Sequence, residues 1–187
     1  MAGSVLEKIF GTKYRVLAFF IERPGGEFYA REIARALDLA PMAVHRDLVA
    51  LQKDGVLTSK EERGKRFFRL KACHLNRQLK VLANLDSGLI HELVKEPTVQ
   101  SVDAMALYGS RASGESSEGS DWDFIVIGDV NKLKLNRMIS QLEQKYQCEI
   151  SVIHYLDADW FKALERNDPA FYREVLKNHV VLKGELP

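Results

Sequence analysis

The stretch Leu107-Tyr-Gly-Ser-Arg-Ala-Ser-Gly-Glu-Ser-Ser-Glu-Gly-Ser-Asp-Trp-Asp-Phe-Ile-Val-Ile127 decides the fold of the carboxyl-terminal half. An apolar run enters a Gly-Ser turn, a polar segment follows, and a second apolar run begins after Asp121 and Asp123. This order predicts a strand, a turn with a short helix or loop, and a second strand. Carboxylates at positions i and i+2 of a strand lie on one face, where a cation has to neutralise them. Oxygen ligands suit Mg²⁺ and the N–H groups of a Gly-Ser turn suit phosphate, so the stretch predicts nucleoside triphosphate chemistry.

The same residues resemble the signature of the DNA polymerase β-like nucleotidyltransferase superfamily, which is Gly-Ser, a spacer and Asp-x-Asp. Here it reads Gly109-Ser110, ten residues, and Asp121-Trp122-Asp123. The ten-residue spacer is similar to that of the minimal nucleotidyltransferases, which include antitoxins paired with HEPN-type toxins. The resemblance covers residues 99–182.

The resemblance implies a role for each residue of the motif. Asp121 and Asp123 would be catalytic carboxylates that hold Mg²⁺, and Gly109 and Ser110 would hold the phosphates of ATP or another NTP. Arg111 would bind the nucleotide and neutralise charge on the pyrophosphate, although a basic residue at this place can also pack locally. Trp122 is expected to point into the core.

The family mechanism also implies a third catalytic carboxylate, on the next strand. The usual alignment puts that position on Ser151, whereas Glu149 lies two residues earlier and faces the same side. Three interpretations stay open. Glu149 substitutes after a shift of about 6–7 Å along the strand; the site works with two carboxylates and a more hydrated metal; or the domain is a weakened catalyst that senses nucleotide or binds protein.

The amino-terminal half has helical spacing of apolar residues, followed by two short β-type runs. We expect helices over 5–21 with a break at Gly11, over 30–37 and over 41–53, and strands over 56–59 and 66–70 on either side of a charged tip. The order resembles a winged helix-turn-helix domain of bacterial and archaeal regulators. The matching residues are Ala30-Arg31-Glu32-Ile33-Ala34, Val44-His45-Arg46-Asp47-Leu48 and the run from Leu51 to Leu57.

This second resemblance implies a recognition helix over 41–53 that enters the major groove of double-stranded DNA. The residues expected to face DNA are Met42, His45 and Arg46 on the helix and Arg63, Lys65 and Arg66 at the wing tip. Residues 1–70 carry 13 Lys/Arg against 9 Asp/Glu, a net charge of +4, whereas the rest carries 14 against 17, a net of −3. We expect salt-sensitive binding by a homodimer. The alternative is a domain that only mediates protein contacts.

Apolar residues at spacings of three and four over 71–96 predict one or two amphipathic helices, serving as a linker packed on both domains or as a dimer helix. The expected fold class is α+β: a winged helix-turn-helix over 1–70, a helical connector over 71–98 and a small mixed-sheet α/β nucleotidyltransferase domain over 99–187. In the last domain we expect strands over 99–108, 122–127, 147–155 and 180–182, and helices over 131–146, 157–166 and 169–178.

Composition narrows the class of protein. The 187 residues are 46% hydrophobic and 28% charged, which is ordinary for a globular protein. No apolar run approaches the roughly 18 residues that span a membrane, and the first residues lack the order of a signal peptide. We therefore expect a cytoplasmic protein without a membrane partner. Cys73 and Cys148 are expected to be free thiols.

Two functions follow. The first is a Mg²⁺-dependent nucleotidyltransferase that moves a nucleoside monophosphate from NTP to a protein or RNA hydroxyl, which in a toxin–antitoxin pair belongs to the partner toxin. The second is a transcriptional regulator or antitoxin whose nucleotidyltransferase-like domain only senses nucleotide or binds a partner. The paired carboxylates favour the first, because a pure regulator does not need them. Ser151 favours the second.

Overall fold

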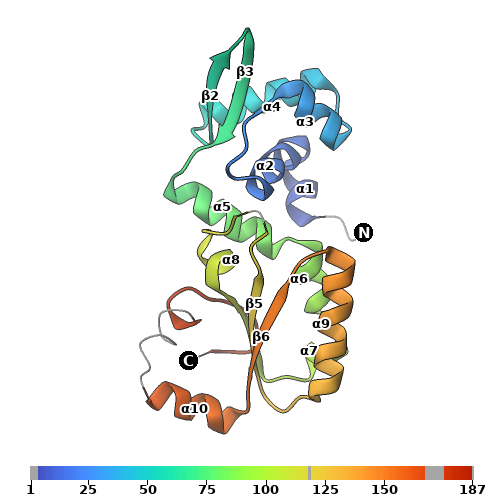
Figure 1. The fold of residues 1–187 in the computed structure, drawn as a ribbon, viewed down its shortest axis with the longest axis vertical. Coiled ribbons are helices and arrows are strands. Elements are labelled where there is room, and N and C mark those ends of the chain that lie inside the picture. The colour runs from blue at the N-terminus through green and yellow to red at the C-terminus, as the bar shows by residue number, and fades with distance from the viewer. Residues whose placement is uncertain (1–3, 118, 167–174, 187) are drawn as a thin grey trace. The chain divides into compact units, whose positions relative to one another are not determined.

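The computed structural model describes the chain except for residues 1–3, 118, 167–174 and 187. It contains two compact units, Met1–Asp86 and Ser87–Pro187 (Figure 1). The boundary lies inside the expected connector, so that α5 (His74–Leu85) belongs to the first unit and α6 (Gly88–Leu93) to the second. Among the described residues, no helix has both the length and the apolar character needed to cross a bilayer.

The first unit is a winged helix-turn-helix, as the sequence predicted. Its elements before α5 are α1 (Val5–Phe10), α2 (Thr12–Glu22), β1 (Phe28–Tyr29), α3 (Ala30–Leu37), α4 (Pro41–Lys53), β2 (Leu57–Glu62) and β3 (Lys65–Leu70). The strands form an antiparallel sheet in the order β1-β3-β2. The wing strands are longer than expected, because Arg63 and Gly64 alone make the turn, both with positive φ.

Buried apolar residues of the helices and of the wing strands build the core of this unit. The members with no exposed surface are Val16, Phe20, Ile33, Val44 and Leu48. The expected break at Gly11 separates α1 from α2, where Gly11 has φ 61° and ψ −143°. Pro41 occupies the first turn of α4, where its missing N–H costs nothing.

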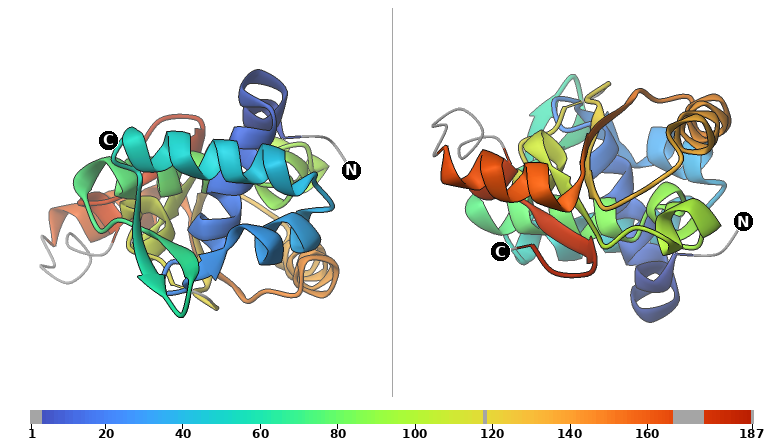
Figure 2. Two further views of the ribbon diagram at one scale, coloured as in Figure 1. Left: turned by 90° about the horizontal axis from the view of Figure 1, so that it is seen from above. Right: turned by 90° about the horizontal axis from the view of Figure 1, so that it is seen from below.

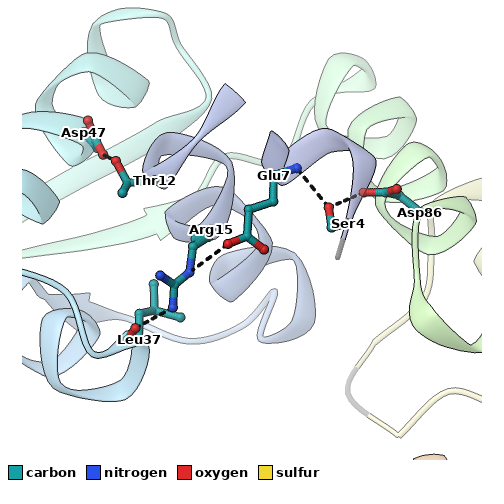
Figure 3. Close-up of polar contacts among 7 residues, drawn as sticks. All are labelled: Ser4, Glu7, Thr12, Arg15, Leu37, Asp47 and Asp86. Atoms are coloured by element: carbon teal, nitrogen blue, oxygen red, sulfur yellow. Dashed lines mark hydrogen bonds and ion pairs between the residues drawn. The ribbon is translucent and has the colours of Figure 1, made fainter. Parts of the chain in front are cut away.

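Asp86 fixes the first helix (Figure 3). Its carboxylate accepts the N–H groups of Val5 and Leu6 at 2.9 and 3.0 Å, and it also accepts the hydroxyl of Ser4. These contacts satisfy donors at the start of α1 that lack partners within the helix. The residue after α5 therefore anchors an otherwise exposed helix.

Further polar contacts join the helices of this unit (Figure 3). Arg15 on α2 pairs with Glu7 at 3.6 Å and donates to the carbonyl of Leu37, at the end of α3, at 2.6 Å. The hydroxyl of Thr12 donates to the buried carboxylate of Asp47 on α4 at 2.7 Å. The start of α2 is thereby tied to the middle of the predicted recognition helix.

The second unit is built on a mixed sheet, as predicted. Its elements after α6 are α7 (Pro97–Gln100), β4 (Ala104–Tyr108), α8 (Gly109–Ser113), β5 (Trp122–Ile127), α9 (Lys132–Tyr146), β6 (Ile150–Tyr155), α10 (Asp157–Glu165) and β7 (Val180–Lys183). The strand order is β6-β5-β4-β7; β5 is parallel to β6 and the other pairs are antiparallel. Helices α9 and α10 lie on opposite sides of the sheet (Figure 1, Figure 2).

Several details differ from the expectations. Val99 lies in the short helix α7, so β4 begins only at Ala104. Leu133, an apolar residue of the helix expected over 131–146, is 80% exposed, whereas Leu135, Met138, Ile139 and Leu142 of the same helix are buried. Helix α10 begins at Asp157, and its N-cap is Leu156, which makes no side-chain capping hydrogen bond. The helix expected over 169–178 falls largely outside the described residues. Cys73 and Cys148 are free, as predicted.

The end of β7 is fastened to the turn before β4 by Lys183. Its ammonium donates to the carbonyls of Val99, Gln100 and Val102, at 3.2, 2.5 and 2.6 Å. These carbonyls lie at the end of α7 and in the following turn, and that of Val99 also accepts the N–H of Val102 at 3.3 Å. A charged hydrogen bond of this kind contributes about 1.5–3 kcal/mol.

We therefore expect Lys183→Met to lower the free energy of unfolding by about 1–3 kcal/mol. Urea unfolding followed by tryptophan fluorescence measures this, because Trp122 and Trp160 both lie in the second unit. The exposed Lys132→Met serves as the control. Equal stability of the two variants would contradict a stabilising role of Lys183.

Candidate functional site

Gly109 and Asp123 are in direct contact. Gly109 follows the last residue of β4 with φ 71°, a conformation that favours glycine. A Cβ at this position would lie 2.5 Å from Oδ2 of Asp123. The register explains the proximity, because Tyr108 stands opposite Asp123 in the antiparallel pair β4–β5. Position 109 thus requires glycine for two reasons: its φ is positive, and the Asp123 carboxylate leaves no room for a Cβ.

The loop after this turn folds back on Ser110. The carbonyl of Ser110 accepts the N–H groups of Glu115 at 2.9 Å and of Ser116 at 3.0 Å, and the hydroxyl of Ser113 at 3.2 Å. Ser116 is buried. Residues 110–116, which include the first part of the polar spacer, therefore form a hydrogen-bonded turn. This turn keeps the Gly-Ser backbone next to the carboxylates.

The two aspartates flank a buried tryptophan, as predicted. Trp122 is 6% exposed and its ring stacks on Phe124, with centroids 6.3 Å apart and planes 9° apart. Asp123 is half-buried on the opposite face, and Asp121 is exposed just before β5 begins. Alternation along the strand therefore anchors the aromatic side and leaves the acidic side open.

Ser151 lies beside Asp123 in the parallel pair β5–β6. Glu149 precedes β6, and its carbonyl accepts the N–H of Trp122 at 2.9 Å. Both Ser151 and Glu149 are exposed. Throughout the described part of the chain, no three His, Cys, Asp or Glu residues are grouped so that they could hold a metal ion. The strand register thus places Ser151 alongside Asp123, and a catalytic role of Glu149 stays a prediction.

The residues present fit one Mg²⁺ ion in donor type. Asp121 and Asp123 offer two carboxylates at the start of β5, and the missing side chain of Gly109 lets the turn approach Oδ2 of Asp123. Mg²⁺ is usually bound by one or two carboxylates together with water and substrate phosphates.

Arg111 turns towards the second half of the motif. Its Nε donates to the carbonyls of Ser120 at 3.1 Å and Asp121 at 3.0 Å, and its guanidinium carbon lies 4.1 Å from the centre of the Trp122 ring. Burial lowers the pKa of Arg111, whereas Cys148 and the two aspartates raise it. For the Cys148 thiol, burial raises the pKa, and the nearby Arg111 cation opposes that rise. The contacts of Arg111 are thus local ones, and a phosphate contact stays a prediction.

The predicted recognition helix presents its expected residues outward. Met42 is 83% exposed, His45 is exposed, and the side chain of Arg46 is 74% exposed, with Nε 3.5 Å from Asp47. Val49, which is also exposed, extends the same surface. Sequence reasoning did not single out Val49, because an apolar residue at that spacing is usually assigned to the core.

The three basic residues of the wing have different environments. Arg63 occupies the turn itself, with φ 50°. The ammonium of Lys65 lies 4.6 Å from the centre of the Tyr29 ring. Arg66 donates to Gln52 at the end of α4 at 2.7 Å and to Ser59 on β2 at 3.0 Å. Arg63 is thus placed at the tip, whereas Arg66 braces the wing against α4.

The close contact at Gly109 can be tested with a matched glycine. Gly109→Ala should lower the free energy of unfolding by about 1–3 kcal/mol more than Gly119→Ala, because the new methyl group collides with Asp123. Gly119 has a similar φ of 79° but nothing within 4 Å of a Cβ, so it reports the backbone cost alone. Urea unfolding of both variants gives the difference. Equal losses would show that Asp123 does not press on Gly109.

Comparison with known proteins gives a family for the second unit. A family model described as polymerase beta, nucleotidyltransferase matches residues 88–185, just over half of the chain. Its start coincides with the start of the second unit at Ser87 to within one residue. No curated protein sequence matches the chain.

Solved structures similar to this chain include two regulators. A possible transcriptional regulator from Methanosarcina mazei Go1 is 15% identical over 48% of this chain and 81% of its own, with a TM-score of 0.34. The homodimeric winged helix-turn-helix DNA-binding domain of a possible ArsR-family regulator from Mycobacterium bovis is 19% identical over 52% and 97%, with a TM-score of 0.31. Likeness at this level says nothing of function. The match over residues 88–185 shows that the chain belongs to the polymerase beta nucleotidyltransferase family.

Proposed function

We propose that the second unit transfers a nucleoside monophosphate from ATP or another NTP to a hydroxyl group of a protein or RNA, in a Mg²⁺-dependent reaction in the cytoplasm. The contact between the Gly109 turn and Asp123, with Asp121 beside it, carries this proposal. It brings a phosphate-binding type of turn and a metal-binding type of carboxylate pair to one end of β5.

Each residue of the site has its own proposed role in binding the metal ion, the phosphates or the acceptor proton. Asp121 and Asp123 hold the ion, which when bound would neutralise triphosphate charge and polarise the α-phosphate. The N–H groups of Gly109 and Ser110, with the Ser110 hydroxyl, hold the outer phosphates. The acceptor oxygen attacks the α-phosphorus while the bond to the bridging oxygen breaks and pyrophosphate leaves. With two carboxylates, the acceptor proton passes to Asp123 or to water.

Labelled ATP, Mg²⁺ and the product of the neighbouring gene as acceptor test this activity. Asp121→Asn with Asp123→Asn should reduce label transfer more than about 100-fold, because the metal supplies several kcal/mol of charge stabilisation. Asp129→Asn, an exposed acid beyond the other end of β5, should leave transfer unchanged. Absence of transfer, together with absence of any nucleotide-dependent thermal shift with each NTP, would refute the enzyme.

A second candidate function is favoured by Ser151 at the place of the usual third acid. In this reading the unit binds nucleotide or a partner without turnover, as the sensing part of a regulator or antitoxin. Calorimetric titration with ATP and Mg²⁺, followed by incubation with the acceptor, distinguishes the two functions, because a sensor gives saturable binding while the nucleotide is recovered intact even with the acceptor present.

For the first unit we propose binding to double-stranded DNA through α4, with Met42, His45 and Arg46 towards the major groove and Arg63 of the wing towards phosphates. The exposure of the three helix residues and the net charge of +4 over residues 1–70 support this. Two copies would read two half-sites, so we propose a homodimer on DNA.

Arg46→Ala should weaken binding to the upstream DNA of its own gene by about 1–3 kcal/mol, measured by fluorescence anisotropy at several salt concentrations. Arg137→Ala, an exposed residue of the second unit, is the control. Affinity that responds neither to Arg46 nor to salt would count against the proposed interface.

A further inference from the structure

We propose that Arg111 is a positioning residue, which holds the main chain of Asp121 where its carboxylate can bind the metal ion. This inference rests on the proposed function of the site. Arg111 would hold Asp121, the metal ligand, in place, and would not contact the nucleotide as the sequence suggested.

The two aspartates are held by different means. Asp123 lies within the sheet, opposite Tyr108 and beside Ser151, and it also presses against Gly109. Asp121 precedes β5, is exposed, and has no position in the strand registers. The ladder that fixes Asp123 therefore stops short of Asp121, whose place depends on contacts of the loop.

Arg111 supplies those contacts. Its Nε and Nη2 both reach the carbonyl of Ser120, and Nε also reaches the carbonyl of Asp121. Its guanidinium carbon lies 4.1 Å from the centre of the Trp122 ring, and Trp122 is buried in the core. The guanidinium group thus contacts three consecutive residues, Ser120, Asp121 and Trp122. Because Trp122 is fixed in the core, these contacts hold the main chain of Asp121 in a defined position.

A direct phosphate contact fits these observations less well. The Nε and Nη2 donors already serve loop carbonyls, and the guanidinium is partly buried against Trp122. To reach a phosphate with the same donors, Arg111 would have to release the loop that carries Asp121. Lysine can replace arginine as a point charge towards phosphate, but it cannot reproduce the planar fork or the stacking.

Metal binding without nucleotide separates the two roles. We expect Arg111→Lys and Arg111→Met to raise the Kd for Mn²⁺, measured by electron paramagnetic resonance on the full chain, by about 10–100-fold, as the loss of groups that orient metal ligands does. Trp122→Phe should raise it less, because a smaller ring remains for stacking. Arg137→Lys and Arg137→Met, on the exposed side of α9, should leave the Kd unchanged.

Each other outcome has a defined meaning. A wild-type chain that binds no Mn²⁺ would refute the proposed function of the site. Wild-type binding with an unchanged Kd in Arg111→Lys would overturn the positioning role alone, and weakened ATP binding in Arg111→Met would then point to the phosphate. Melting temperatures identify variants that fail to fold; if both Arg111 variants do, Trp122→Phe decides, and an unchanged Kd there overturns the proposal.

Discussion

The carboxylate of Asp123 lies against the backbone of Gly109, and the arrangement of the second unit depends on this contact. A side chain at position 109 would push the turn away from β5 and separate the Gly-Ser backbone from the acids. The register of β4 with β5 sets the contact, and the alternation of buried residues fixes that register. A slip by one residue would turn Asp123 to the opposite face, so the apolar core protects the geometry of a polar site.

The site is rigid on one side and held by a loop on the other. Asp123 has the sheet behind it, whereas Asp121 relies on the loop that Arg111 grips. The edge strand β6 offers Ser151 where a third acid is usual. Two carboxylates carry the charge of one divalent ion, so the charge present suits a single Mg²⁺ better than the two-ion sites that a third acid supports. This difference leads to the choice between slow transfer and nucleotide sensing.

The first unit uses polar contacts for a different purpose. Thr12 and Arg15 of α2 bind Asp47 in the middle of α4 and the carbonyl of Leu37 at the end of α3, which fixes both helices of the helix-turn-helix against a common neighbour. Arg66 joins the wing to the end of α4 through Gln52. The outward residues of α4 are therefore presented by a helix that polar contacts hold in place.

The sequence by itself determined the helices, the hairpin and the motif, because hydrophobic period, turn residues and caps act within a few residues of the chain. The helices over 30–37 and 41–53 have the predicted bounds, and Gly109, Ser110, Asp121 and Asp123 were identified from type and spacing. Only the tertiary structure decided that β7 pairs with β4, that Leu133 is exposed, that Ser151 stands beside Asp123, and that Arg111 and Arg66 bind neighbouring segments. These facts depend on which distant segments meet and on where long side chains find partners, and no local pattern records either.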